Sequence, residues 1–581
     1  MPVARHRLAL LPLLFCGVVG AASAQGQEYA RPTANPHQSA SVALATGGMA
    51  ASSHPLVTLT ALDVLRNGGN AADAAIAANA VNGVVEPMSC GVGGDLFVLY
   101  WDQKSRTLHG LNASGSSPAA LNRGVFEERE LTEIPLTGPL PWSVPGCVDG
   151  WAMLHAKFGR AEWSELIAPA ADLAERGFPV TEVIAAYWKA SEPALSRFPT
   201  SANALLTDDG DAPAEGEVWR NPALAASLRV IAEQGADGFY RGPIAAEIVR
   251  FSEANDGFLS ADDFADHRGE WVEPASTTYR GKRVYELPPN GQGIAALQML
   301  NLLEPHDLRA MGRGAGWWHL FAEAKKLAFA DRARFYADPA FSDVPVDALI
   351  SKEYAAARQP LIDGHAAATD VPHGDPKLGR ADTIYLTVVD EERNCCSLIQ
   401  SNYYGFGSKV VPGDVGFALQ NRGNLFSLDP DHPNALEPGK RPFHTIIPAM
   451  VTEPDGEDGE RPWLCFGVMG GDMQPQGHVQ ILVNLLDFGL NLQAAGDAAR
   501  IEHVGSQTPT GRPMDADGGT LVAEPTIPDE VVRDLRTRGH RVVRGRNGGG
   551  YQAVLIDWSA GENGVLHGAT EPRKDGVALG Y

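Results

Sequence analysis

The chain has 581 residues, of which 44% are hydrophobic and 20% are charged, an ordinary globular composition with ample material for a hydrophobic core. Its length exceeds the roughly 100–200 residues of a usual domain, so more than one structural unit is expected. The formal net charge of −24 repels nucleic acid and anionic lipid in general, which argues against a nucleic-acid partner.

The N-terminus has the pattern of a secretory signal. Two arginines precede an apolar stretch over residues 8–20, and Ala22-Ser-Ala24 follows as a small-residue cleavage site. The apolar stretch is too short for a membrane span of about 20 residues. Lipidation of Cys16 is a minor alternative, because the bulky Phe15 precedes it. We therefore predict a signal peptide over residues 1–24 and a periplasmic or secreted mature protein.

Five of the six cysteines remain after such a cut. Their number is odd, and they form no Cys-x-x-Cys pair and have no histidine partners at zinc-ligand spacing, so neither a disulfide framework nor a metal site is indicated. Buried free thiols are the default prediction for Cys90, Cys147, Cys395, Cys396 and Cys465.

The first elements of the mature chain are predicted to be helices. A helix over residues 56–65 is closed by a glycine pair, and Asn70 caps the next helix with Asp73 in capping-box position. The glycine run at 91–94 precedes a strand over 96–101. A dinucleotide-binding loop would follow a strand and open a helix, so this run is not that motif.

Helices continue to dominate up to a long polar segment. One helix is predicted over residues 148–158, and helical periodicity prevails over 163–300 and 317–336. A stretch rich in Gly, Pro and Asp, residues 363–382, then interrupts the pattern.

The part after residue 382 is predicted to be rich in strands. A helix over 477–486 follows the Gly470-Gly471 pair. A helix-rich part and a strand-rich part that meet near residue 382 suit an α+β fold, an α/β/β/α sandwich. The predicted strands span residues 383–389, 396–400, 417–419, 446–452 and 462–468.

The first of these strands begins with a threonine that a chain cut could activate. A threonine hydroxyl is a poor nucleophile unless a base lies beside it, and cleavage between Asp382 and Thr383 would supply the α-amino group of the same residue. That amine has an ordinary pKa of roughly 7.7–8.0 and can be neutral near physiological pH. Taken alone, however, the pattern is more typical of a structural threonine, because threonines begin many strands.

Further motifs follow one another in order from about residue 56 to residue 581. In order and spacing, the chain resembles the γ-glutamyltransferase (glutathione hydrolase) family of N-terminal-nucleophile hydrolases. Besides the strand at Thr383, the motifs are Asn-Gly-Gly-Asn-Ala-Ala-Asp-Ala-Ala at 67–75, Val-Glu-Pro at 85–87, Gly-Val-Gly-Gly at 91–94, Val-Pro-Gly at 144–146, Gly-Lys-Arg-Pro at 439–442, Gly-Val-Met-Gly-Gly at 467–471, Glu-Pro-Arg at 571–573 and Gly-Tyr at 580–581.

The resemblance implies a precursor that cuts itself between Asp382 and Thr383. Two autoprocessed subunits, heavy (25–382) and light (383–581), then stay associated in a four-layer α/β/β/α sandwich, and no metal or organic cofactor is implied. Thr383 would attack a substrate amide.

The resemblance also assigns the groups around the nucleophile. The backbone N–H groups of Gly470 and Gly471 would stabilise the oxyanion, helped by the positive end of the following helix. Ser401 matches the hydroxyl that relatives place against the nucleophilic threonine.

The positions that bind a glutamate head group in relatives depart from the family pattern. Ser114 stands where an arginine holds the α-carboxylate, and Leu425 stands where an aspartate holds the α-amino group. Tyr403 replaces a helping asparagine, and His444-Thr445 replaces a serine pair. Since burying an unpaired ammonium costs several kcal/mol, the usual glutamyl site is largely dismantled.

Arg422 replaces a neutral side chain in the same pocket. It could form a bidentate clamp for a substrate carboxylate, with a surface arginine as the alternative interpretation. This variant pattern looks like the branch that includes oxamate amidohydrolase-like and acylase-like members.

We therefore expect a self-cleaving amidohydrolase or acyltransferase that cleaves γ-glutamyl or related amide bonds, like a glutathione hydrolase, through an acyl-enzyme on Thr383. The expected partner is a small-molecule amide, with no nucleic acid and no membrane span. Two alternatives stay open. One is an amidase for oxamate-like or acyl-amide donors, and the other is a catalytically silent periplasmic binding protein of the same fold.

Overall fold

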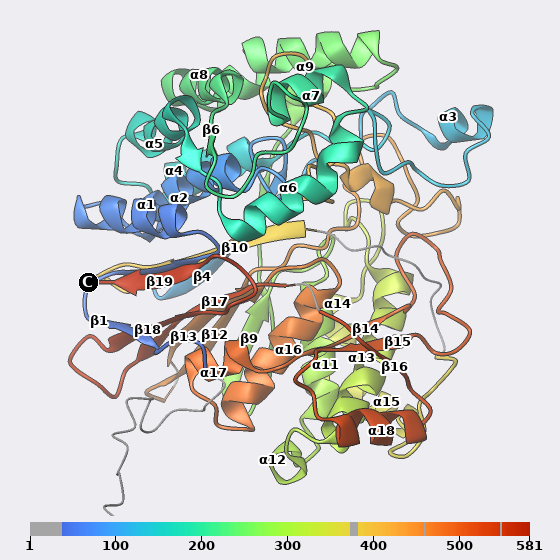
Figure 1. The fold of residues 1–581 in the computed structure, drawn as a ribbon. Coiled ribbons are helices and arrows are strands. Elements are labelled where there is room, and N and C mark those ends of the chain that lie inside the picture. Colours follow the sequence, from blue (N-terminus) through green and yellow to red (C-terminus); the bar gives the residue numbers. More distant parts are fainter. Residues whose placement is uncertain (1–37, 372–381, 458, 547–548) are drawn as a thin grey trace, which may run out of the picture.

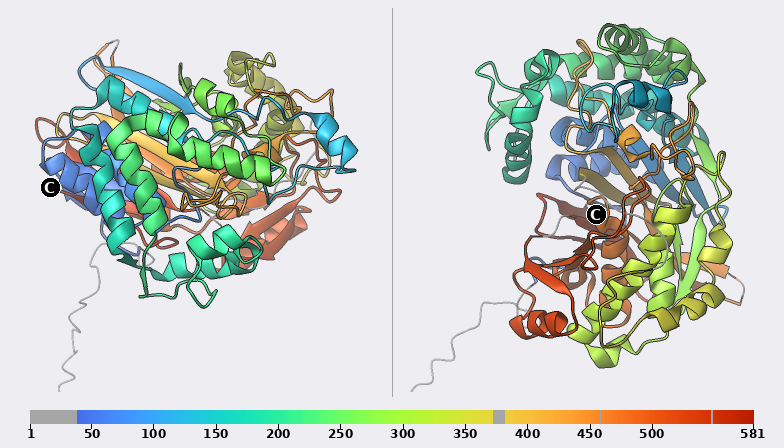
Figure 2. Two further views of the ribbon diagram at one scale, coloured as in Figure 1. Left: turned by 90° about the horizontal axis from the view of Figure 1, so that it is seen from above. Right: turned by 90° about the vertical axis from the view of Figure 1, so that its right-hand side faces the viewer.

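The computed structural model describes residues 38–371, 382–457, 459–546 and 549–581. Within them, most strands belong to two seven-stranded sheets stacked face to face, with helices covering both outer sides (Figure 1). Figure 2 shows the strands lying between the two helical layers. The predicted α/β/β/α sandwich is confirmed. The predicted signal peptide, residues 1–24, lies outside the described residues.

One of the two sheets, here called the upper sheet, carries Thr383. Its strand order is β19-β2-β10-β11-β3-β4-β7. The central strands β10 and β11 are antiparallel, with a register irregularity between Asp382 and Ile384 that leaves Thr383 outside the regular pairing. The strands are β2 Met49–Ser52, β3 Asp95–Asp102, β4 Thr107–Ala113, β7 Glu270–Val272, β10 Asp382–Val389, β11 Cys395–Tyr403 and β19 Val577–Gly580.

The other, lower sheet has the order β1-β18-β17-β13-β12-β9-β8. Both sheets join strands from before residue 382 to strands from after it, through the ladders β2–β10 and β3–β11 above and β1–β18 and β9–β12 below. The lower strands are β1 Ala43–Ala45, β8 Ala275–Tyr279, β9 Lys282–Glu286, β12 Ala449–Asp455, β13 Gly459–Val468, β17 Tyr551–Asp557 and β18 Val565–Thr570.

Helices early in the chain pack on the upper sheet, and later ones pack on the lower sheet (Figure 1). The early group is α1 Pro55–Arg66, α2 Ala71–Val85, α3 Arg123–Glu128, α4 Cys147–Phe158, α5 Trp163–Arg176, α6 Glu182–Leu195, α7 Pro199–Leu205, α8 Pro222–Tyr240, α9 Pro243–Ala254 and α10 Ala261–Asp266. The late group is α11 Gly293–Leu303, α12 Leu308–Met311, α13 Ala315–Phe335, α14 Val346–Leu349, α15 Lys352–Arg358, α16 Met473–Leu486, α17 Leu492–Asp497 and α18 Asp529–Thr537. A small sheet of β14 Ile501–Val504, β15 Thr520–Ala523 and β16 Arg541–Arg544 adjoins the late group.

Hydrophobic cores separate the layers. Tyr385 and Val389 of β10 lie in the core between the two sheets. Leu386 and Val388 of the same strand face the early helices. This alternation confirms the period-2 pattern predicted for residues 383–389.

The predicted capping box at the start of α2 is also confirmed. The Asn70 side chain accepts hydrogen bonds from the N–H groups of Ala72 and Asp73, and the Asp73 carboxylate accepts one from the Asn70 N–H. Three N–H groups at the helix start thereby gain partners.

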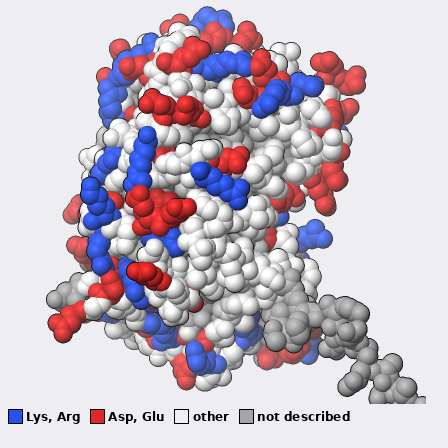
Figure 3. Space-filling view, turned by 90° about the vertical axis from the view of Figure 1, so that its left-hand side faces the viewer, with Lys and Arg blue, Asp and Glu red and all other residues white. Residues whose placement is uncertain are grey.

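The cysteines, the surface charges and the lengths of the helices bear on the predictions made from composition. The cysteines Cys90, Cys147, Cys395, Cys396 and Cys465 are buried free thiols, as predicted. On the face drawn in Figure 3, acidic and basic side chains are interspersed around a largely uncharged area. Across the described part of the chain, every helix is too short or too polar to cross a bilayer.

Residues 163–300 contain more strand than their helical periodicity predicts. Besides β7, β8 and β9, a two-stranded sheet of β5 Phe178–Pro179 and β6 Val218–Trp219 lies among the helices. Arg280 and Gly281, both with positive φ, form the two-residue turn between β8 and β9, which suits a hairpin. The prediction missed these strands because they are too short for alternation to stand out.

The strand predicted over residues 417–419 is wrong. A Cβ added to Gly93 would lie 2.2 Å from the carbonyl oxygen of Ala418, and the Gln420 N–H donates to the Gly93 carbonyl at 2.9 Å. This segment therefore packs on the glycine run at 91–94 instead of joining a sheet.

Two boundaries in the later part also differ from the prediction. The strand expected over 446–452 is β12, which begins three residues later, at Ala449. The helix expected to begin at residue 477 is α16, which begins at Met473. Gly477 is therefore an interior residue of this helix. A Cβ at this position would lie 2.5 Å from the side chain of Val468 on β13, so glycine permits the close contact between helix and sheet.

Candidate active site

Thr383 and Ser401 lie against each other at the centre of the upper sheet. Thr383 is 1% exposed, and its hydroxyl donates to the Ser401 Oγ at 3.3 Å. The Ser401 Oγ also accepts a hydrogen bond from the Tyr403 N–H at 2.8 Å. The two hydroxyls that the sequence selected are thus neighbours in space, although 18 positions separate them.

A cavity of about 780 Å³ opens beside Thr383. Its wall includes Gly470 and Asp472 from the turn after β13, together with Lys325 from α13. The volume is within the roughly 300–1,000 Å³ of small-molecule sites. Thr383, a glycine turn and charged groups therefore share one cavity of substrate size.

Gly470 and Gly471 connect β13 to α16 with positive φ values of 117° and 57°. Their carbonyls accept hydrogen bonds from the N–H groups of Met473 and Gln474. Neither glycine N–H donates to a partner within the described residues. Two free N–H groups at the start of a helix are the arrangement that stabilises a developing oxyanion.

A buried polar network that the sequence analysis missed holds this turn. The Gln292 side chain donates to the carbonyls of Thr445 and Gly471 at 2.7 and 2.9 Å. Arg332 donates to the Gln292 Oε1 and to Asp472, both at 2.6 Å. Gln292 lies just before α11 and Arg332 lies on α13, far in sequence from the glycine pair, so no local motif connects them to it.

Replacing Gln292 by leucine is expected to loosen the glycine turn. Leaving buried partners unsatisfied costs about 1–3 kcal/mol each, so the free energy of unfolding should fall by a few kcal/mol and kcat should fall with it. The measurements are denaturant unfolding and steady-state kinetics.

Gln298→Leu is the matched control. Gln298 is also buried on α11 and bonds Asp331 and Tyr336, so this change should lower stability without a specific loss of kcat. Equal kcat values for the two variants would contradict the role given to Gln292.

The five residues predicted to contact substrate form a buried cluster that is not part of the cavity wall. Arg422 lies at the start of a short 3-10 helix and is 0% exposed, so its interpretation as a surface arginine is wrong. Its Nη1 donates to the Thr445 Oγ1 at 2.6 Å, and its guanidinium carbon lies 4.8 Å from the centre of the Tyr403 ring. Tyr403 itself has φ 80°, a conformation that an aromatic residue rarely adopts. The cluster is Ser114, Tyr403, Arg422, His444 and Thr445, none of which is in the wall of the cavity as described.

Two of the five residues, Arg422 and Tyr403, have side-chain groups that lack a hydrogen-bond partner in the described part of the chain. Within the described residues, the Nε and Nη2 of Arg422 and the Tyr403 hydroxyl are buried and unbonded. Ser114, in contrast, donates to Asn112 at 2.7 Å and accepts from Asn290 at 3.1 Å. Only the Arg422–Tyr403 side of the cluster therefore offers free donors to a ligand.

Asp95 is the carboxylate of this cluster, and the sequence analysis missed it. Its Oδ1 accepts from the N–H groups of Gly115 and Gly146 at 3.0 Å and from Gln420 at 2.9 Å, and its Oδ2 is 3.1 Å from the His444 Nε2. Burial raises the pKa of Asp95 to about 7, although Arg422 acts to lower it. Burial, with Arg422 nearby, holds the pKa of His444 well below its usual value.

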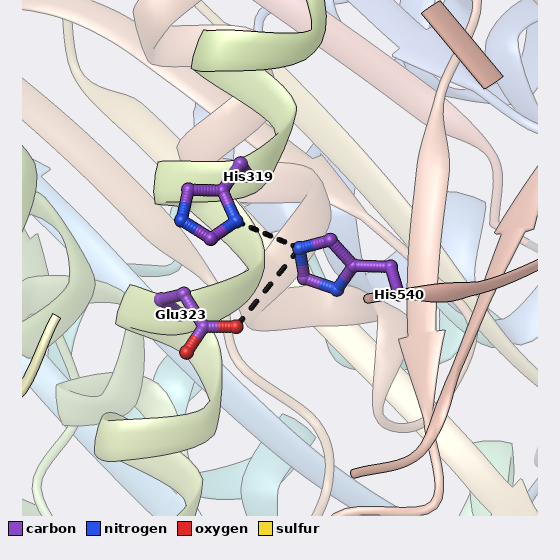
Figure 4. A group of neighbouring side chains, drawn as sticks. All are labelled: His319, Glu323 and His540. Carbon is purple, nitrogen blue, oxygen red and sulfur yellow. Dashed lines mark hydrogen bonds and ion pairs between the residues drawn. The ribbon is translucent and has the colours of Figure 1, made fainter. Parts of the chain in front are cut away.

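A separate group of two α13 residues and His540 could hold a metal ion by its residue types. His319, Glu323 and His540 have ligand atoms within 4.8 Å of one another, and Figure 4 shows His319 and Glu323 directed at His540. Sequence spacing could not indicate this group, because His540 is 221 positions from His319.

Protein groups already satisfy these ligand atoms. The His319 Nδ1 is 2.8 Å from the His540 Nε2. Glu323 accepts from the Lys326 ammonium at 2.8 Å and from the Ala368 N–H at 3.1 Å. An ammonium on the carboxylate opposes cation binding, so we interpret this cluster as an anchor for the chain near Ala368.

Comparisons with known proteins agree with this geometry. A family model described as Gamma-glutamyltranspeptidase matches residues 58–581. The chain is 37% identical over 542 residues to the Glutathione hydrolase-like YwrD proenzyme of Bacillus subtilis, covering 92% of this chain and 99% of that one. It is 34% identical over 554 residues to the Oxamate amidohydrolase proenzyme of Klebsiella pneumoniae, covering 93% and 99%.

A solved structure is similar throughout. The crystal structure of cephalosporin acylase from Bacillus halodurans superposes with a TM-score of 0.85 at 40% identity, covering 96% of this chain and 98% of that chain.

Proposed function

The chain belongs to the gamma-glutamyltranspeptidase family of enzymes, and on this premise we propose that it is a self-cleaving amidase for a donor whose acyl part carries a carboxylate and no α-ammonium. The proposed cut lies between Asp382 and Thr383. It divides the mature chain into a heavy subunit, 25–382, and a light subunit, 383–581, exported by the signal peptide to the periplasm or the medium.

The main support for this proposal is that two hydrogen-bond donors of the Arg422 side chain have no acceptor among the described residues. A buried N–H group without an acceptor costs about 1–3 kcal/mol, and Arg422 has two such groups beside the free Tyr403 hydroxyl. A planar carboxylate is the ligand that fits a guanidinium fork. Leu425, which is buried, offers nothing to an ammonium, and Asp95 already accepts from its own donors.

The cut itself would give a ligand access to these donors. The Asp382 backbone pairs with Tyr403 in the β10–β11 ladder, and Tyr403 lies over Arg422. Departure of Asp382 after cleavage would release this pairing and so allow Tyr403 to move off Arg422. The ladders that join strands from both sides of residue 382 would keep the two subunits together.

The proposed reaction passes through an acyl-enzyme. The Thr383 hydroxyl attacks the carbonyl carbon of the amide while the Thr383 amine takes the hydroxyl proton. The N–H groups of Gly470 and Gly471 stabilise the negative oxygen. The C–N bond then breaks, the amine product leaves with that proton, and water or an amine releases the acyl group from Thr383.

A γ-glutamyl donor is the second candidate, because a relative named Glutathione hydrolase proenzyme, from Escherichia coli, is 31% identical over 553 residues. Three anilides that differ only in the acyl part separate the two. Glutaryl anilide has one carboxylate, γ-glutamyl anilide adds an α-ammonium, and pentanoyl anilide has neither.

The proposal expects the glutaryl donor to exceed both others in kcat/KM by roughly tenfold or more, since a charge-assisted contact contributes about 1.5–3 kcal/mol. A γ-glutamyl donor cleaved faster than the glutaryl donor would decide for the second candidate.

A further inference from the structure

Lys325 is a buried lysine in the wall of the cavity that contains Thr383. It lies on α13, it is 1% exposed, and it lines the cavity together with Thr383, Gly470 and Asp472. The proposed reaction gives it no role.

The hydrogen-bond partners of Lys325 are neutral. Its ammonium donates to the Ser506 Oγ at 2.7 Å and lies 3.2 Å from the His503 Nδ1. The other nitrogen of His503 bonds the Gly518 carbonyl at 2.9 Å, which places its proton there and leaves Nδ1 as an acceptor. An ammonium has three donors, so one donor has no oxygen or nitrogen acceptor in the described residues after these two bonds, and the ammonium also lies 3.9 Å from the centre of the Phe329 ring.

No carboxylate forms an ion pair with Lys325 among the ion pairs within the described residues. Its neighbour Lys326, equally buried, is paired with Glu323 at 2.8 Å. Asp472, in the same cavity wall, is bound by Arg332. Burial accordingly lowers the pKa of Lys325 well below its ordinary value, although Asp472 and Glu502 act to raise it. The described surroundings of Lys325 thus lack the negatively charged partner that a buried ammonium requires.

The position of Lys325 indicates which half of a substrate would supply that anion. Arg422, assigned above to the acyl part, is not among the described residues that line the cavity, and its guanidinium lies over the Tyr403 ring. Lys325 is one of the residues that line the cavity. An amide bond held at Thr383 with its acyl part toward Arg422 would direct its amine part into that cavity.

We propose that Lys325, with Ser506 and His503, binds a carboxylate on the amine half of the substrate, so that the leaving group is an amino acid or an amine of similar chemistry. This inference rests on the proposed amidase function, to which it adds the class of the leaving group.

Two probes that differ only in the leaving group test it, N-glutarylglycine and N-glutarylglycinamide. The wild type should favour the glycine probe by roughly tenfold to a hundredfold in kcat/KM, mainly through a lower KM, as expected for a charge-assisted contact. Lys325→Met keeps the length of the side chain and removes the charge, so the ratio should fall to about one through a higher KM for the glycine probe.

Lys574→Met is the matched control. Lys574 lines the same cavity and lies over the Tyr187 ring at 4.4 Å, so its replacement should leave the preference intact. Self-cleavage into two chains reports folding of both variants. If Lys325→Met fails to fold, inhibition of the wild type by glycine and by glycinamide gives a second measurement, in which glycine should inhibit at lower concentration.

The outcomes separate the two proposals. A wild type that cleaves both probes equally, equal inhibition by glycine and glycinamide, or a Lys325→Met enzyme that keeps the preference would overturn the role of Lys325. A wild type that cleaves neither glutaryl probe would instead contradict the proposed amidase function.

Discussion

A Thr383→Ala chain is expected to remain a single uncut polypeptide without amidase activity. Alanine has no hydroxyl to attack the Asp382 carbonyl, so neither the cut nor the free α-amine can form. In related cases, removal of a nucleophile lowers kcat by about 10⁶-fold, and here the missing amine adds to the loss. Denaturing electrophoresis and a donor assay measure both effects.

The wild type should show two bands. N-terminal sequencing should identify Gln25 for the heavy subunit, if the signal peptide is removed as predicted, and Thr383 for the light subunit. Thr383→Ser is the matched control, because serine keeps both the hydroxyl and the prospective amine, and it should cleave and turn over more slowly than the wild type. A Thr383→Ala chain that still breaks at this bond and hydrolyses donors is incompatible with the mechanism.

The strand that begins near Thr383 was predicted from local alternation in the sequence, whereas the role of Thr383 as a nucleophile was predicted from the family resemblance. Period-2 alternation placed Tyr385 and Val389 on one face of β10 and Leu386 and Val388 on the other, as the cores show. The fold followed from the same kind of evidence together with the family motifs. Short edge strands and the segment at 417–419 were not predicted correctly, because their conformation depends on which distant backbone lies alongside.

The supports of the site could not be predicted in this way. Gln292 lies just before α11 and Arg332 lies on α13, and in the sequence they look like ordinary polar residues of helical segments. Their importance appears only when those helices pack beneath the turn at Gly470 and Gly471. Long-range contacts of single polar side chains leave no periodic signal.

For Arg422, the sequence predicted the positive charge in the pocket but not its environment. Its substitution for a neutral residue indicated a new cation, and the structure places that cation beside Tyr403. Its complete burial and its two unbonded donors could not be read from the sequence. Burial lowers the pKa of Arg422 to about 10, so it remains charged at neutral pH.

Arg422→Leu is expected to lower kcat/KM for the glutaryl anilide by roughly tenfold to a hundredfold, because a charge-assisted bidentate contact contributes about 1.5–3 kcal/mol. The ratio of glutaryl to pentanoyl turnover should fall toward one, since the two donors differ only in the carboxylate. Arg393→Leu is the control. Arg393 is also buried but bonds backbone carbonyls such as that of Asn563, so its loss should lower stability and keep the ratio.

Stability gives a second, independent readout for Arg422. Leucine at position 422 removes two unsatisfied buried donors, which favours folding. It also removes the hydrogen bond to Thr445 and the positive charge near Asp95, which opposes that gain, so the Arg422→Leu enzyme should unfold within a few degrees of the wild type. The proposal thus requires a variant that is close to the wild type in stability and has lost its preference for a carboxylate. An Arg422→Leu enzyme with unchanged kinetics on the glutaryl anilide would show that the carboxylate binds elsewhere.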